Sequence, residues 1–133
     1  MKIRTILREI QQSTSKFFDN YKKENEGKLN QCREMCKEKG YPLNNQHDEY
    51  FFKEHGKLMN IPINKIQIGQ KKVESKVLDR KGTQMDLENY KPIHVFKFEG
   101  NLYLHDGHHR TVNLIENGKN TVKGYVVNLD KMK

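Results

Sequence analysis

The sequence predicts an α+β fold in which a helical extension, residues 1–60, packs on a small α/β domain, residues 61–133. Before residue 60, apolar residues recur at spacings of three and four, as they do on one face of an amphipathic helix. After it, short runs rich in β-branched and aromatic residues alternate with polar turns, as in strands of a sheet. The 133 residues suit one ordinary domain, or a small domain with an extension.

The helical half divides into three segments. The first is expected from Met1 to about Lys23, the second ends at Gly40, and a shorter third spans Gln46 to His55. The apolar positions that predict the first two are Ile3, Ile6, Leu7, Ile10, Phe17, Phe18 and Tyr21, followed by Leu29, Cys32, Met35 and Cys36. The aromatic run Tyr50-Phe51-Phe52 is expected to pack this half onto the rest.

Cys32 and Cys36 lie four positions apart, on one face of the second expected helix. No other pair of sulfur ligands completes a zinc site, so both are interpreted as reduced structural residues. A metal site shared with His47 or His55 is the less favoured alternative, since its spacing matches no familiar zinc finger.

The second half is interpreted as strands with two helices. Its expected elements are a strand at Ile61–Ile66 with Pro62 at an edge, a basic loop to Lys81, a short helix at Met85–Tyr90, strands at Pro92–Phe98 and Leu102–His105, a helix at His108–Glu116 and a strand at Val122–Leu129. Asn117-Gly118 supplies the stop signal of the last helix. In the basic loop, Lys71 and Lys72 are candidate phosphate contacts, although such runs commonly form a solvated surface.

The segment Asp106-Gly107-His108-His109-Arg110 is the strongest functional signal. A strand that turns directly into a helix directs unpaired amides and the positive end of the helix dipole at one point, which suits an anion. Gly107 permits a close approach of the backbone, and Arg110 offers two parallel hydrogen bonds to phosphate.

The neighbouring side chains add proton chemistry. His108 and His109 are candidate acid or base groups, with His109 favoured as the proton carrier and His108 as the orienting residue. Asp106 can orient a histidine, bind Mg²⁺ or cap the helix. The alternative is a ligand-free turn with Asp106 as the cap, but the five ionisable groups between His105 and Arg110 favour a site. His94, on the neighbouring strand, is interpreted as an ordinary strand residue.

Residues 61–130 resemble the ParB/sulfiredoxin-like family, which has a small mixed sheet. The resemblance rests on the Ile-Pro-Ile-x-x-Ile start, the hairpin, and the Asp-Gly-His-His-Arg box with its Gly-x-x-Arg core at Gly107 and Arg110. In relatives this box holds nucleotide phosphates. His108 stands where sulfiredoxins have cysteine, which argues against sulfinic-acid repair. The sequence of the box is most similar to that of free-serine kinases and ParB-like nucleases. Those kinases use an acidic residue after the first strand; the nearest positions here are Gln70 and Glu74.

The resemblance implies a nucleotide-binding protein that carries out phosphoryl transfer or hydrolysis at the Asp106–Arg110 turn, with a nucleoside triphosphate or diphosphate and Mg²⁺ as cofactors. One alternative is a metal-dependent nuclease with Asp106 on the metal. Another is a non-enzymatic protein of phage or plasmid type that binds DNA or a host protein, or forms a homodimer, through its helical extension.

Composition is compatible with each of these functions. Hydrophobic residues make up 34% and charged residues 32% of the chain, which is typical of a polar but foldable protein. No apolar run approaches the roughly 20 residues of a membrane helix, and the first residues lack the apolar stretch of a secretory signal, so a cytoplasmic location is expected. The net charge of +8 favours polyanionic partners such as nucleotides or nucleic acid.

Overall fold

The computed structural model of the protein describes residues 21–41, 43, 48–69 and 86–132. Most of the helix expected from Met1, and the candidate residues Lys71 and Lys72, lie outside the described residues. The described elements are α2 (Lys23–Glu38), α3 (Asp48–His55), β1 (Lys57–Pro62), the 3-10 turn η1 (Ile63–Lys65), β2 (Ile66–Gln67), β3 (Ile93–Phe98), β4 (Asn101–Asp106), α5 (His108–Glu116), β5 (Thr121–Asn128) and the 3-10 turn η3 (Leu129–Lys131).

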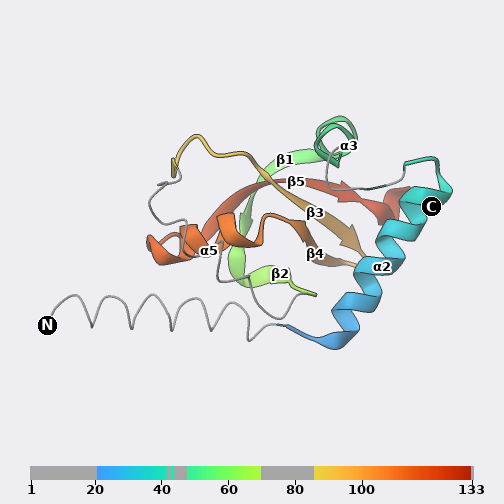
Figure 1. Cartoon of the computed structure of the whole chain (residues 1–133), viewed down its shortest axis with the longest axis horizontal. Coiled ribbons are helices and arrows are strands. Elements are labelled where there is room, and N and C mark those ends of the chain that lie inside the picture. The colour runs from blue at the N-terminus through green and yellow to red at the C-terminus, as the bar shows by residue number, and fades with distance from the viewer. Residues whose placement is uncertain (1–20, 42, 44–47, 70–85, 133) are drawn as a thin grey trace, which may run out of the picture.

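Five strands form one mixed sheet in the order β1-β5-β3-β4-β2 (Figure 1). β3 pairs with β4 in an antiparallel hairpin and with β5 in parallel, while β1 pairs with β5 antiparallel and β2 with β4 in parallel. The fold is therefore α+β with a mixed sheet, as the sequence predicts.

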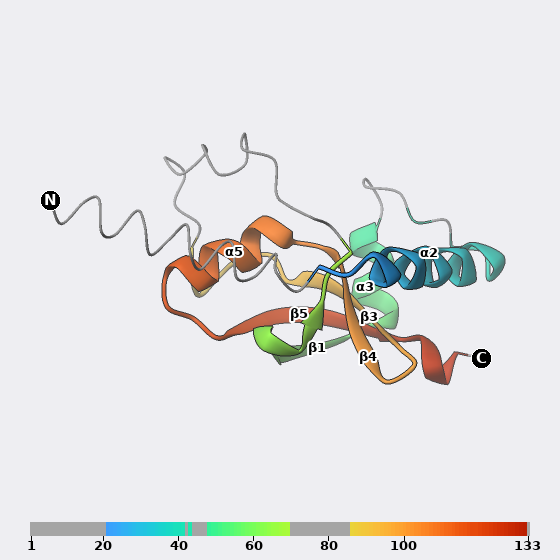
Figure 2. The same ribbon diagram turned by 90° about the horizontal axis from the view of Figure 1, so that it is seen from below.

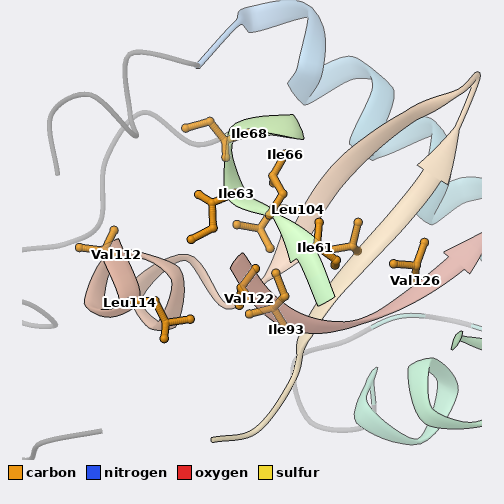
Figure 3. Packing of buried hydrophobic residues seen from close by; sticks show 11 residues of the cluster. Ile61, Ile63, Ile66, Ile68, Ile93, Leu104, Val112, Leu114, Val122 and Val126 are labelled. Atoms are coloured by element: carbon orange, nitrogen blue, oxygen red, sulfur yellow. The ribbon is translucent and has the colours of Figure 1, made fainter. Parts of the chain in front are cut away.

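The two faces of the sheet carry different apolar clusters. On one face, Ile93, Val95 and Leu104 pack with Val112 and Leu114 of α5, a cluster shown in Figure 3. The other face joins α2 and α3 through a second cluster: Leu29, Cys32, Cys36, Phe51, Phe52, Phe96, Phe98, Tyr103, Val127 and Leu129. Figure 2 shows α5 and α2 toward opposite ends of the sheet.

The strand, turn, strand and helix predicted between Ile93 and Glu116 are confirmed. β3 and β4 are joined at Glu99 and Gly100, whose φ angles of 52° and 79° are the left-handed values that a two-residue hairpin turn requires. α5 begins at His108, and the chain leaves it at Gly118 with φ 75°. The helices ending near Gly40 and His55 and the last strand are also found, within two residues of their predicted ends where these are described.

Three other predictions are wrong. The strand expected at Ile61–Ile66 is instead the end of β1, a 3-10 turn and β2, because the chain turns directly after Pro62 and Ile63 N bonds to Asn120 O at 3.0 Å. Residues 86–90 form bends rather than a helix, since the Asp86 carboxylate accepts the amides of residues 88 and 89. At Tyr21, where a helix was expected, the chain pairs with Ile68 as an isolated parallel bridge.

The helical extension and the sheet share a core. β1 begins at Lys57, so it crosses the expected boundary at residue 60, and α2 packs on β3 and β4 through the second apolar cluster. The division into residues 1–60 and 61–133 stays a prediction. No helix within the described ranges combines the length and the apolar character needed to span a membrane.

Candidate functional site at the start of α5

The turn between β4 and α5 has the predicted geometry. Asp106 ends β4, Gly107 takes a left-handed conformation with φ 111°, and α5 starts at His108. Thr111 donates the first intrahelical amide bond, to Gly107 O at 3.0 Å. The amides of residues 108–110 therefore have no acceptor within their own helix, and they lie at the positive end of its dipole. Such a turn favours an anion.

Gly107 is also required by packing. A Cβ atom at this position would lie 2.4 Å from Ile93 Cγ2 and 2.8 Å from Ile93 Cβ. The glycine thus serves both the backbone angle and the contact between the turn and β3, in addition to any role toward a ligand.

The guanidinium of Arg110 is hydrogen-bonded within the protein. Its Nη1 donates to the carbonyl oxygens of Lys91 and Pro92 at 2.8 and 3.0 Å, and its Nη2 donates to Asp106 Oδ2 at 3.3 Å. The side chain is 16% exposed. Arg110 thereby ties α5 to the chain entering β3, and a phosphate would have to compete with these acceptors for its donors.

Asp106 does not cap α5, because the N-cap residue is Gly107 and no side chain accepts a cap hydrogen bond there. Its side chain is 55% exposed, and Oδ2 lies 3.8 Å from His94 Nδ1. Asp106 can therefore still reach a ligand in solvent while contacting Arg110.

The two histidines of the box differ in environment. His109 is exposed, whereas the ring of His108 has a buried Nε2 atom with no hydrogen-bond partner among the described residues. Burial lowers the pKa of His108 to about 4, although the nearby Asp106 carboxylate opposes the shift. His108 is therefore neutral at pH 7.

A pocket of about 480 Å³ lies beside this turn, between α2 and the end of β4. Its lining residues are Glu26, Leu29, Asn30, Arg33, Gly69, Leu104, His105 and His108. The pocket therefore joins the first residue of α5 to Arg33, which no functional prediction from the sequence included.

Two residues of the pocket lining, Arg33 and His105, form a polar triad with the buried Asp48 behind them. His105 Nε2 lies 2.6 Å from Asp48 Oδ2, and Arg33 Nε donates to His105 Nδ1 at 3.2 Å. Because the Arg33 nitrogen is always a donor, His105 Nδ1 must accept, and the ring proton lies on Nε2 facing Asp48. Burial lowers the pKa of His105, partly offset by its hydrogen bond to Asp48, which agrees with this neutral tautomer.

Phe52 connects the triad to His94. Its ring stacks on His94 with centroids 4.6 Å apart and on His105 with centroids 5.5 Å apart. His94 is 5% exposed, and burial lowers its pKa. It is thus part of a buried histidine cluster rather than an ordinary strand residue.

Sequence reasoning counted His105 among the ionisable groups beside the box, without giving it a role, and missed Arg33 and Asp48. Asp48 and His105 are 57 positions apart, and Arg33 and His105 are 72 apart, so no local spacing indicates their contact. The one local signal is an arginine on the same helical face as Leu29 and Cys36, where an apolar residue would continue the pattern.

Both cysteines are buried free thiols. Burial raises the pKa of Cys32 to about 12 and that of Cys36 to about 11, which makes both weak nucleophiles. His55 packs its ring against Tyr41 and Phe51. Among the described residues, no group of three His, Cys, Asp or Glu side chains is arranged to hold a metal ion.

Comparison with known proteins gives a weak similarity to a solved structure. No protein-family model matches the chain, and no curated protein matches it. Among solved structures, the chain is similar to sulfiredoxin from Arabidopsis thaliana, with 19% sequence identity, coverage of 57% of this chain and 92% of that chain, and a TM-score of 0.38. At this level the similarity carries over no function and no residue role.

Proposed function

We propose that the protein binds the phosphate groups of a nucleoside triphosphate or diphosphate at the turn between β4 and α5. The observation that carries the proposal is the left-handed Gly107, which lies between β4 and α5 as the N-cap, so that the first-turn amides of the helix face one point. The amides of His108 and His109 would contact phosphate oxygens. Asp106, more than half exposed, would be the protein ligand of a Mg²⁺ ion whose other ligands are phosphate oxygens and water.

The basic side chains would complete the phosphate site. Arg110 would reach phosphate once its bond to Asp106 is exchanged, while its two bonds to the carbonyls of Lys91 and Pro92 hold the turn in place. Lys71 and Lys72 are proposed as further contacts from the sequence alone.

The reaction proposed at this site is phosphoryl transfer or hydrolysis, with a histidine as the proton carrier. His108 is neutral at pH 7, so it could accept a proton as a base but could not donate one as an imidazolium acid. His109 is exposed and can exchange protons with solvent, which favours it as the carrier and leaves His108 as the orienting group.

A thermal-shift panel tests the binding step. The ligands are ATP, ADP, CTP, GTP and pyrophosphate, each with and without Mg²⁺, and a short DNA duplex for comparison. A ligand at a hundred times its dissociation constant should stabilise the fold by about 2.7 kcal/mol. If no nucleotide or pyrophosphate shifts the melting temperature, the proposal is wrong.

The DNA arm separates the alternative functions. Binding by a basic surface must weaken steeply between about 50 and 200 mM salt, since counterions compete for the phosphates. A DNA-dependent shift with that salt dependence, and none with nucleotides, would indicate a nucleic-acid-binding protein instead.

A further inference from the structure

We propose that the pocket between α2 and β4 is the subsite for a terminal phosphate, and that Arg33 is its specificity-determining cation, positioned by Asp48 through His105. This inference rests on the proposed phosphate binding at the α5 turn, and it adds a cation from the helical half to Arg110, the cation that the sequence identifies.

Arg33 has the charge that the pocket requires. Among the described residues that line the pocket, only Arg33 carries a permanent positive charge. His108 lines the same pocket and is the first residue of α5, so an anion there would lie next to the first turn of that helix. The carboxylate of Glu26, which also lines the pocket, is hydrogen-bonded by Tyr21.

Hydrogen bonds at Nε and Nη1 fix the orientation of the Arg33 guanidinium. Its Nε is fixed by His105 at 3.2 Å and Nη1 lies 3.4 Å from Asn30 Oδ1, on the same helix. A guanidinium oriented in this way presents its remaining N–H groups without a further loss of side-chain freedom, and its planar fork suits two phosphate oxygens. The guanidinium of Arg110, in contrast, is occupied by two backbone carbonyls and Asp106.

Burial of the Asp48–His105 pair costs desolvation free energy. Both side chains are 6% exposed, and Asp48 Oδ1 has no hydrogen-bond partner among the described residues. An apolar pair of similar volume would avoid the desolvation of a carboxylate. What the polar pair supplies is the tautomer of His105, because the carboxylate holds the ring proton on Nε2 and leaves Nδ1 to accept from Arg33.

The unpaired nitrogen of His108 points to the same ligand. Its Nε2 is buried next to this pocket without a partner among the described residues, and a phosphate oxygen would supply one. The predicted ligand class is therefore a phosphate monoester or diphosphate end, such as the end of a nucleotide or pyrophosphate.

Calorimetric titration of the whole chain with pyrophosphate and with ATP tests the assignment. Arg33→Ala should weaken binding by about tenfold or more, the effect of losing hydrogen bonds to a charged group. Lys37→Ala is the matched control, since it removes one positive charge from an exposed position of the same helix, outside the pocket, and should change affinity less than about twofold. Arg33→Lys, which keeps the charge but loses the fork, should still lose several-fold in affinity.

The positioning role has its own test. His105→Leu should weaken binding about as much as Arg33→Ala, while His105→Gln should restore most of the affinity. A glutamine amide offers one acceptor and one donor, as the neutral imidazole does. The melting temperature of each variant is measured as well, so that affinities are compared only between variants that are folded at the temperature of the titration.

The outcomes separate this inference from the proposed function. If the wild type binds and Arg33→Ala binds with the affinity of Lys37→Ala, the inference is overturned and the proposed function stands. Where Arg33→Ala does not fold, Arg33→Lys takes its place in this comparison. Equal loss in His105→Gln and His105→Leu would overturn the role of Asp48 and His105 in positioning Arg33. If the wild type binds neither ligand, both the inference and the proposed function fail.

Discussion

At Gly107, two physical constraints meet at one backbone position. Its φ of 111° is strained for any residue with a side chain, and a Cβ there would lie 2.4 Å from Ile93 Cγ2. Gly107→Ala should therefore combine backbone strain with overpacking and lower the free energy of unfolding by about 3 kcal/mol or more. Urea denaturation of the variant and the wild type measures this difference.

Gly118 provides the matched control. It has a φ of 75°, but a Cβ there would meet no atom within 4 Å. Gly118→Ala should cost only the conformational strain, about 1 kcal/mol. Equal losses at the two glycines would show that the contact with Ile93 contributes nothing.

The sequence predicts part of this residue-scale picture. Asp-Gly after a strand and before a helical pattern identifies Gly107 as the turn residue, because the signals are adjacent in the chain. The contact with Ile93 and the three acceptors of Arg110 depend on how β3 and α5 pack, which no local pattern specifies.

At the scale of elements, α3 is attached to the sheet by one side chain above all. Phe52 has no exposed surface and contacts Phe96, His94 and His105 through its ring. Phe52→Ala should cost about 3–5 kcal/mol, as for other large aromatic truncations in a core. Chemical denaturation measures this loss.

Tyr50 lies on the same helix and is 76% exposed. Tyr50→Ala should change stability by no more than about 0.5 kcal/mol. A comparable loss in both variants would contradict the attachment through Phe52. The structure thus divides the aromatic run, which was expected to pack as a unit, into Phe51 and Phe52 inside and Tyr50 outside.

Elements with local signals were predicted well, and those that depend on distant pairing were not. The hairpin and α5 follow from alternation, turn residues and a stop signal within 26 positions, 93–118. β1, in contrast, contains the exposed Leu58 and Met59 and becomes a strand by pairing with β5, 59 to 69 positions later. β2 has two residues and forms only because β4 lies beside it.

At the scale of the whole molecule, three of the described histidines, His94, His105 and His108, lie wholly or partly buried where the helical half meets the sheet. Burial lowers the pKa of His94, His105 and His108, so that all three favour the neutral form in the folded state. His94 and His105 are joined by stacking on Phe52 of α3, and His105 is bound to Arg33 of α2. Protonation of this cluster therefore opposes the packing of α2 and α3 on the sheet.

This burial makes stability depend on pH. Below the unfolded-state pKa of about 6.5, an unfolded histidine binds a proton that the folded one does not, so the free energy of unfolding falls as the pH falls. For His108, whose folded-state pKa is about 4, the loss between pH 7 and pH 5 is about 2 kcal/mol. His94 and His105 should add to the loss in the same direction.

Urea denaturation at pH 7 and pH 5 measures the effect. His108→Gln should reduce the difference between the two pH values by about 2 kcal/mol, because glutamine does not take up a proton in this range. His109→Gln is the comparison variant: it removes the same residue type one position further along, where the residue is exposed, and should reduce the pH dependence less than His108→Gln does. The free energy of unfolding could instead stay constant between pH 7 and pH 5, or its pH dependence could change equally in both variants. Either result would mean that His108 is not buried as a neutral base. Its unpaired Nε2 would then no longer support a phosphate oxygen as its partner.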